Sequence, residues 1–167
     1  MPYIAPEIFK GATFSKESDI YSMGMIMWEL TTGCKPFANV DHDIDLIYKI
    51  IDGKRPEITD DTPECFANLM KRCWDSDPSK RPSIAEIKNT IMDLHLFGYS
   101  SMYPNTNAEE FKQAERKRLQ LIKSMKLGPE FNEKPHSDTN YTSRALSSLI
   151  SKSTNSSSRI SFDVKQG

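Results

Sequence analysis

The sequence predicts an all-α fold for its first 96 residues, followed by one further helix and a polar tail. Apolar residues recur at three- and four-residue spacing in four segments of that region, and helix start and stop residues bound these segments. No run alternates apolar and polar residues as a half-buried strand would. A chain of 167 residues has room for one modest domain with extensions.

Composition and charge restrict the classes of function. A formal charge of −1 and a pI near 6.3 give no electrostatic reason to expect a nucleic-acid partner. No apolar run is long enough to span a bilayer, and no secretory signal is visible at the N-terminus. The three cysteines suit reduced thiols, so we expect an intracellular protein, cytoplasmic or nuclear. Cys65 and Cys73 with His42 or His95 lack the spacing typical of a metal site.

The first helix is expected over residues 19–32. Its apolar residues fall on two faces, with Ile20, Met23, Met27 and Leu30 on one and Tyr21, Met25 and Trp28 on the other. Gly33 is placed to end it, because glycine readily adopts the left-handed conformation that follows a helix. A helix that is apolar on more than one face is expected to be buried nearly all round.

Three further helices are expected before residue 97. Residues 43–52 carry an apolar face and are followed by Gly53. The next helix is predicted to start at Pro63, a favoured first helical residue. The last is predicted to start at Ser83, where the Ser83 hydroxyl and the Glu86 carboxylate form a capping box. Their apolar stripes are Ile44, Ile47, Tyr48 and Ile51; Phe66, Leu69, Met70 and Cys73; and Ile84, Ile87, Ile91 and Leu94.

Beyond a linker at 97–107, residues 108–127 are predicted to form an extra amphipathic helix. Asn107 and Glu110 are a candidate capping pair, and Gly128-Pro129 is a candidate stop. Its apolar stripe is interrupted by charge, which leaves open a helix packed loosely on the domain and a membrane-surface or partner-binding helix. Residues 128–167 are Ser-rich and predicted to be mostly disordered. Their serine clusters are interpreted as a solubilising linker or as phosphate acceptors.

Four short motifs are spaced along the first 82 residues. They are Ala5-Pro6-Glu7, Asp19-Ile20-Tyr21-Ser22-Met23-Gly24, Cys73-Trp74, and Asp77-Pro78 leading to Arg81-Pro82. Each is weak alone, but in this order and spacing they resemble the C-terminal part of a eukaryotic protein kinase domain, from its Ala-Pro-Glu motif to its last helix. The resemblance implies a partial C-terminal lobe of the protein-kinase-like fold over residues 1–96. Pro2 to Glu7, together with Cys73-Trp74, is typical of the tyrosine-kinase-like serine/threonine group.

The resemblance implies roles for individual residues. Glu7 is expected to pair with Arg81 in a bidentate, partly buried bridge. Asp19 resembles the kinase aspartate that accepts backbone amides from the catalytic loop; that loop is absent here, which leaves Asp19 as a candidate helix cap. Trp74 is expected to pack near Pro6 and the Arg81 loop. The remaining motif positions are Ala5 and Gly24, and the loop expected to seat a protein substrate comprises Pro2, Tyr3 and Ile4.

None of the ATP-handling motifs of a kinase occurs in these 167 residues: no Gly-rich loop, no Val-Ala-Ile-Lys, no His-Arg-Asp and no Asp-Phe-Gly. We therefore expect no catalytic, cofactor-binding or metal-binding residue in this chain, with ATP and Mg²⁺ belonging to the parent kinase. The favoured hypothesis is a fragment of a serine/threonine kinase, truncated in the gene or gene model and inactive alone. The alternative is a non-catalytic interaction module that competes for substrates or regulators.

A physical expectation follows from the missing half of the domain. The helix at 19–32 would lose neighbours that enclose it in a complete kinase, so Met23, Met25, Met27 or Trp28 should be partly exposed. Such a patch favours low solubility or a molten state.

Overall fold

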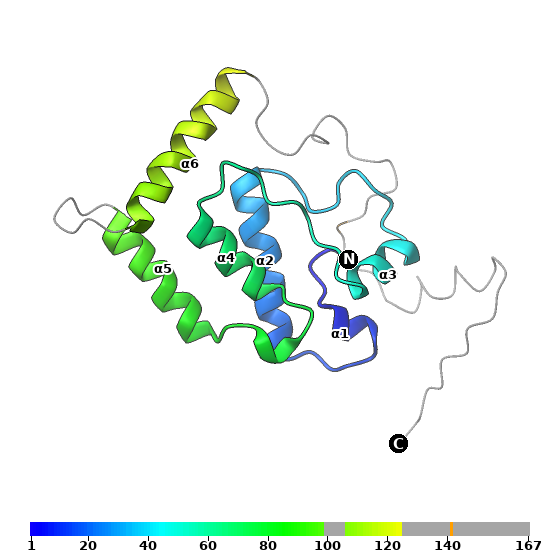
Figure 1. The fold of residues 1–167 in the computed structure, drawn as a ribbon. Coiled ribbons are helices and arrows are strands. Elements are labelled where there is room, and N and C mark those ends of the chain that lie inside the picture. The colour runs from blue at the N-terminus through cyan, green and yellow to red at the C-terminus, as the bar shows by residue number, and fades with distance from the viewer. Residues whose placement is uncertain (99–105, 125–140, 142–167) are drawn as a thin grey trace.

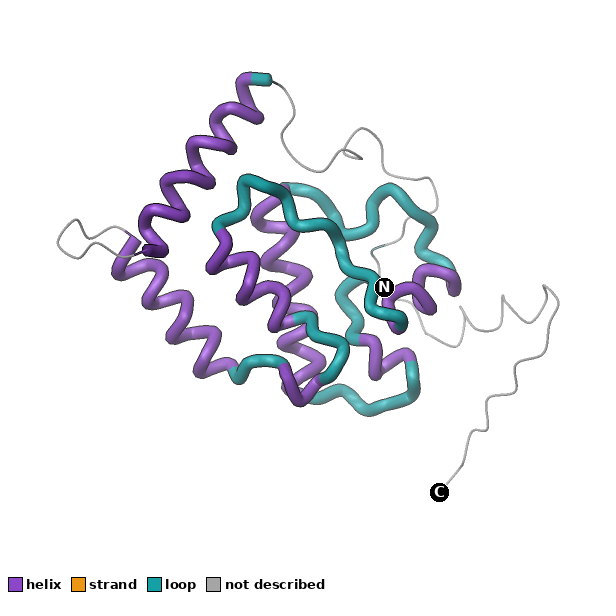
Figure 2. The backbone as a smooth tube through the Cα atoms, viewed as in Figure 1, coloured by secondary structure: helices purple, strands orange, loops and turns teal. Residues whose placement is uncertain are grey.

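The computed structural model describes residues 1–98, 106–124 and 141, and within them it contains helices and loops but no strand (Figures 1 and 2). This confirms the all-α prediction. The elements, in chain order, are α1 (Pro6–Phe9), α2 (Lys16–Thr32), α3 (Ile44–Ile51), α4 (Glu64–Cys73), the 3-10 helix η1 (Pro78–Lys80), α5 (Ile84–Gly98) and α6 (Thr106–Lys123). The long helix α2 lies at the centre, with α4 against it, α1 and α3 to one side, and α5 and α6 to the other.

Helix α2 begins earlier than its apolar pattern predicted. Ser15 caps it, because the Ser15 hydroxyl accepts the Ser18 amide while the Ser18 hydroxyl accepts the Ser15 amide, which is a capping box. Asp19 is therefore an exposed residue of the first turns, and the prediction that it caps the helix is wrong. At the other end Gly33 adopts φ 69°, as predicted for the residue that stops the helix.

Gly24 allows α2 and α4 to approach closely. A Cβ atom at this position would lie 2.9 Å from the Cβ of Cys73 and 3.3 Å from the backbone nitrogen of Trp74. A contact of 2.9 Å is shorter than packed carbon atoms allow, so a side chain at Gly24 would push the two helices apart. Glycine is therefore required at this motif position by the close packing of α2 against α4.

The exposure predicted for α2 is confirmed at one residue and wrong at three. Met23 is partly exposed, whereas Met25, Met27 and Trp28 are at most 2% exposed. Trp28 also donates its indole N–H to the carbonyl oxygen of Glu57. The exposed apolar residues of this helix are instead Ile26, at 44%, and Leu30, at 75%. Burial is not all round, because the neighbouring segments leave one side of α2 uncovered.

The shorter helices follow their predicted bounds closely. Asp43 caps α3 by accepting the Leu46 amide at 3.0 Å. Pro63 occupies the N-cap position of α4, one residue before the predicted role as first helical residue. The predicted capping box at the start of α5 is present, with the Ser83 amide donating to the Glu86 carboxylate at 2.9 Å. Helix α5 continues to Gly98, past the boundary expected at residue 96.

Helix α6 packs against α5 and α4 (Figure 1), and its residue Ala114 is buried. It begins at Thr106, so Asn107 lies inside the helix and the predicted Asn107–Glu110 capping pair is wrong. The Glu110 carboxylate accepts the backbone amide of Cys65 at 2.8 Å instead. Cys65 is in the first turn of α4, so a residue of α6 caps another helix. The Gly128-Pro129 stop and the serine clusters fall in residues outside the described part of the chain.

Candidate functional site

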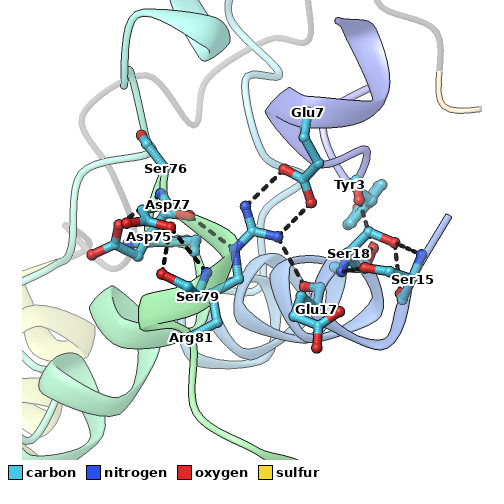
Figure 3. Close-up of polar contacts among 12 residues, drawn as sticks. Tyr3, Glu7, Ser15, Glu17, Ser18, Asp75, Ser76, Asp77, Ser79 and Arg81 are labelled. Atoms are coloured by element: carbon cyan, nitrogen blue, oxygen red, sulfur yellow. Dashed lines mark hydrogen bonds and ion pairs between the residues drawn. The ribbon is translucent and has the colours of Figure 1, made fainter. Parts of the chain in front are cut away.

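Arg81 is the centre of a polar cluster that joins three segments distant in sequence (Figure 3). Its Nη1 and Nη2 atoms donate to the two carboxylate oxygens of Glu7 at 2.6 and 2.8 Å, across 74 positions of sequence. The same guanidinium donates to the carbonyl oxygens of Glu17 and Asp75, both at 2.9 Å. The Arg81 side chain is fully buried. We call this group of four residues the Arg81 clasp.

The clasp connects α1, the first turn of α2 and the turn before η1. A planar guanidinium fits a carboxylate through two parallel hydrogen bonds, which fixes direction as well as distance. Burial pushes the pKa of Glu7 up, but the hydrogen bonds and charge of Arg81 outweigh it, so the pKa is lowered overall. Glu7 is therefore ionised at neutral pH, and the pair holds the start of the chain on the helical core.

A second arginine, Arg55, lies in the same region and was missed at the sequence level. Its Nε donates to the carbonyl oxygen of Trp74 at 2.9 Å, and its Nη1 donates to the carbonyl oxygen of Ile50 at 3.0 Å. The guanidinium groups of Arg55 and Arg81 lie 4.9 and 5.2 Å from the ring centroid of Tyr21. In the sequence, Arg55 is only a single arginine between Gly53 and Pro56, and this signal is too weak to predict its contacts with Trp74 and Tyr21.

Tyr21 is fully buried against these two cations. Burial raises the pKa of its hydroxyl to about 12, although both arginines act in the opposite direction. The ring contributes packing area and a negative face to the guanidinium groups. Tyr21, which was predicted only as a core residue of the helix, thus also contacts the guanidinium groups of Arg55 and Arg81.

The loop expected to seat a substrate, Pro2 to Ile4, is hydrogen-bonded to α2 through Tyr3. The Ser22 hydroxyl donates to the Tyr3 carbonyl oxygen at 2.7 Å, and the Tyr3 hydroxyl donates to the Glu29 carboxylate. Burial, with the hydrogen bond and charge of Glu29, raises the pKa of Tyr3 far above its usual value. Pro2 is fully buried, while Tyr3 and Ile4 are half-buried. Ala5 and Pro6, which lead into α1, are buried as well.

The structure brings some of the sequence-predicted residues together and separates others. Glu7 and Arg81 meet directly, and Gly24 lies against Cys73 and Trp74. Trp74 is buried at the C-terminal end of α4, in the core cluster that also contains Ala5. Asp19 is exposed on α2.

Burial raises the pKa of all three thiols, Cys34, Cys65 and Cys73. The described residues contain no group of three or more His, Cys, Asp or Glu side chains that could hold a metal ion. Burial raises the pKa of Cys73 to about 11, and burial with a hydrogen bond to Glu110 raises that of Cys65 to about 11. A thiol with a raised pKa is a poor nucleophile at neutral pH. Nor does any described helix have the length and apolar character needed to cross a bilayer.

The motifs, the all-α fold and the clasp between an Ala-Pro-Glu glutamate and a distant arginine define the class as the C-terminal lobe of a protein kinase. The family model for protein tyrosine and serine/threonine kinases matches residues 1–91, more than half of the chain. The chain belongs to this family, which confirms the resemblance.

Individual relatives agree with the family assignment. The chain is 37% identical over 98 residues to mitogen-activated protein kinase kinase kinase 7 of Homo sapiens, covering 58% of this chain and 16% of that protein. It is 37% identical over 90 residues to a putative serine/threonine-protein kinase/receptor of Acanthamoeba polyphaga mimivirus, covering 54% of this chain and 6% of that protein. The chain therefore spans less than a fifth of the length of these relatives.

A solved structure gives the same fold. The cryo-EM structure of the AtMLKL3 tetramer matches with a TM-score of 0.55 and 31% sequence identity. The match covers 75% of this chain and 24% of that chain. That share of this chain is larger than the 58% matched in the human relative, so the structural likeness extends over more of the chain than the sequence likeness does.

Proposed function

We propose that this chain is the substrate-seating and scaffolding part of a serine/threonine protein kinase of the tyrosine-kinase-like group. In the complete kinase, the γ-phosphate of ATP is transferred to a protein hydroxyl with the help of Mg²⁺. The chain alone does not catalyse this transfer, because positioning and charge stabilisation supply nearly all of the catalysis in this reaction. The residues that provide them are not among its 167.

The single observation that carries the proposal is the support of the loop at residues 2–6. The clasp between Glu7 and Arg81 holds the loop at its C-terminal end, and Glu29 and Ser22 hold Tyr3 near its N-terminal end. A loop tied at both ends to a buried helix is preorganised to present its surface to another protein. Tyr3 and Ile4 are half-buried and remain partly accessible for such a contact.

Serine/threonine specificity is supported by the relatives and by the loop itself. The matched relatives are named as serine/threonine-protein kinases or as a mitogen-activated protein kinase kinase kinase. The loop reads Pro2-Tyr3-Ile4, without the basic-Trp sequence usual in true tyrosine kinases. We therefore assign the substrate class as proteins with serine or threonine acceptors, and Tyr3 and Ile4 as the residues that contact the position after the acceptor.

A chimera tests this assignment. Residues 1–98 would replace the matching segment of human mitogen-activated protein kinase kinase kinase 7, and phosphate transfer to serine, threonine and tyrosine peptides would be measured with Mg²⁺ and ATP. We expect transfer to serine or threonine, lost on Arg81→Ala and retained on Arg72→Ala, whose side chain is exposed. A folded chimera that is inactive, or one that prefers tyrosine, would contradict the proposal.

The 167-residue chain provides the second half of the test. Incubated alone with Mg²⁺ and ATP, it should transfer no phosphate, and its melting temperature should not respond to the nucleotide. Nucleotide-dependent transfer that disappears in the Arg81→Ala variant would show that the chain is itself an active enzyme.

The alternative, a non-catalytic interaction module, is favoured by one structural observation. The core around Tyr21, Met25 and Trp28 is fully buried without any ATP-binding half. A module of this kind should reduce the phosphorylation of a protein substrate when it is added to a related active kinase. An added chain that leaves the phosphorylation rate unchanged would remove this alternative.

A further inference from the structure

Tyr141, which lies far beyond the kinase-like region in sequence, contacts the loop that follows α2. Its hydroxyl donates to the carbonyl oxygen of Pro36 at 3.1 Å, across 105 positions of sequence. Its ring meets the His42 ring edge to face, with centroids 4.8 Å apart and an interplanar angle of 83°. The Lys35 ammonium lies 5.9 Å from the centre of the same ring. Three kinds of contact therefore converge on one side chain.

The loop that receives Tyr141 is held in shape by its own residues. Phe37 adopts a φ of 57°, which is unusual for a residue with a large side chain, and it is buried. The carbonyl oxygen of Phe37 accepts a hydrogen bond from Nε2 of His42 at 3.2 Å. Since a carbonyl can only accept, this contact requires the proton on Nε2. Pro36 is fully buried, so its carbonyl oxygen is presented from a rigid position.

The same loop is linked to the substrate-seating residues. Lys35, beneath the Tyr141 ring, forms an ion pair with Glu29, and Glu29 accepts the hydrogen bond from the Tyr3 hydroxyl. Burial, followed by the charge of Glu29, raises the pKa of Tyr141 to about 12, which keeps its hydroxyl a donor at neutral pH. Tyr141 also adds to the electrostatic field that raises the pKa of Tyr3. The two tyrosines thus lie on either side of one carboxylate and its lysine.

We propose that the surface formed by Lys35, Pro36 and His42 is a docking site for the chain's own C-terminal segment, anchored by Tyr141. Docked there, Tyr141 lies against Lys35, whose partner Glu29 also holds the Tyr3 hydroxyl, and it limits the approach of a protein partner over Tyr3. This consequence for partner access rests on the proposed function, whereas the docking itself does not. The anchor explains why a tyrosine within a polar, serine-rich tail occupies a half-buried position.

Hydrogen exchange on the full chain tests the docking without any assay of activity. Two loop amides report on the site, since the Ala38 amide donates to Lys35 and the Val40 amide donates to Phe37. In Tyr141→Ala their exchange should speed up roughly tenfold, and in Tyr141→Phe roughly threefold, because Phe keeps the ring contact and loses the hydrogen bond. The Trp74 amide in the core should not change. Tyr103→Ala, in the connection between α5 and α6, is the matched control.

Unchanged exchange at Ala38 and Val40 in Tyr141→Ala would overturn the proposal. Protection that rises with protein concentration would also overturn it, because the anchor would then come from a second copy of the chain. If Tyr141→Ala loosens the whole fold, a photoreactive benzoylphenylalanine at position 141 decides the question. A cross-link within residues 35–42 of the same chain supports the docking site, and a cross-link elsewhere contradicts it.

Discussion

Two arginines hold opposite ends of the central helix α2, and they do so in different ways. Arg81 donates to the carbonyl oxygen of Glu17 near the start of α2, and Arg118 donates to that of Thr31 near its end. The Arg81 side chain is fully buried and makes two hydrogen bonds to Glu7. The Arg118 side chain is 38% exposed, and its nearest carboxylate oxygen, on Asp61, is 3.9 Å away.

Burial and the number of hydrogen bonds, and not the residue type, therefore decide how much each arginine contributes to the free energy of unfolding. A buried charge that loses its partner is left without water to replace it, which is costly. A partly exposed arginine that is removed is replaced by solvent, so the loss is small. The stability of the contacts at the start of α2 should therefore depend mainly on Arg81. The attachment of α6 at the other end of α2 should depend on several weak contacts.

Removal of Arg81 should have the largest effect. In Arg81→Ala the Glu7 carboxylate loses its partner, and the carbonyl oxygens of Glu17 and Asp75 lose a donor, so the free energy of unfolding should fall by about 3–5 kcal/mol. Urea unfolding followed by circular dichroism measures this change. Arg116→Ala, at an exposed position of α6, is the control and should change the free energy of unfolding little. If the two variants unfold at the same urea concentration, the clasp does not stabilise the fold.

Acid should weaken the clasp in a defined pH range. Because the pKa of folded Glu7 lies below its ordinary value of 4.5, the pair contributes its stability above that pH, and the contribution is lost as pH falls through the folded pKa. The difference in melting temperature between the natural chain and Glu7→Gln should therefore be constant near neutrality and shrink below about pH 4.5. A difference that stays the same down to strong acid would show that Glu7 acts through packing instead of charge.

An intermediate effect is expected at Glu110, which caps α4 from a different helix. Glu110 of α6 accepts the Cys65 amide in the first turn of α4, where its negative charge interacts favourably with the dipole of α4. Glu110→Gln removes this charge. The free energy of unfolding should fall by about 1 kcal/mol. Glu109→Gln, the neighbouring and exposed position, should change it much less. Equal effects of the two substitutions would mean that α6 does not use Glu110 to attach to the domain.

The smallest effect is expected at Arg118. Arg118→Ala removes one hydrogen bond and an ion pair to the buried Asp61. Because the two charged atoms are 3.9 Å apart and water can reach the partly exposed guanidinium site, the free energy of unfolding should fall by less than about 1 kcal/mol. Chemical denaturation of this variant beside Arg81→Ala gives the comparison directly. A loss at Arg118 as large as that at Arg81 would show that exposure does not separate the two ends of α2.

Much of the fold could be predicted because its signals are local. The capping box of Ser83 and Glu86 and the helix stop at Gly33 depend on residues a few positions apart, and the structure has both. The start of α2 was misplaced, because Ser15 precedes the apolar pattern and its partner Ser18 lies within the same first turn. A search for apolar periodicity alone passes over such a polar start.

The helical class, the kinase family and the partnership of Glu7 with Arg81 could be predicted without coordinates, since each depends on patterns or motif spacing along the chain. Tertiary contacts alone show that Arg55 donates to the Trp74 carbonyl oxygen, that Glu110 caps α4, and that Tyr141 reaches Pro36. They also decide that Leu30 is exposed and Trp28 buried on one helix. The physical reason is that these outcomes depend on which segments lie side by side, and neither periodicity nor charge within a segment specifies its neighbour.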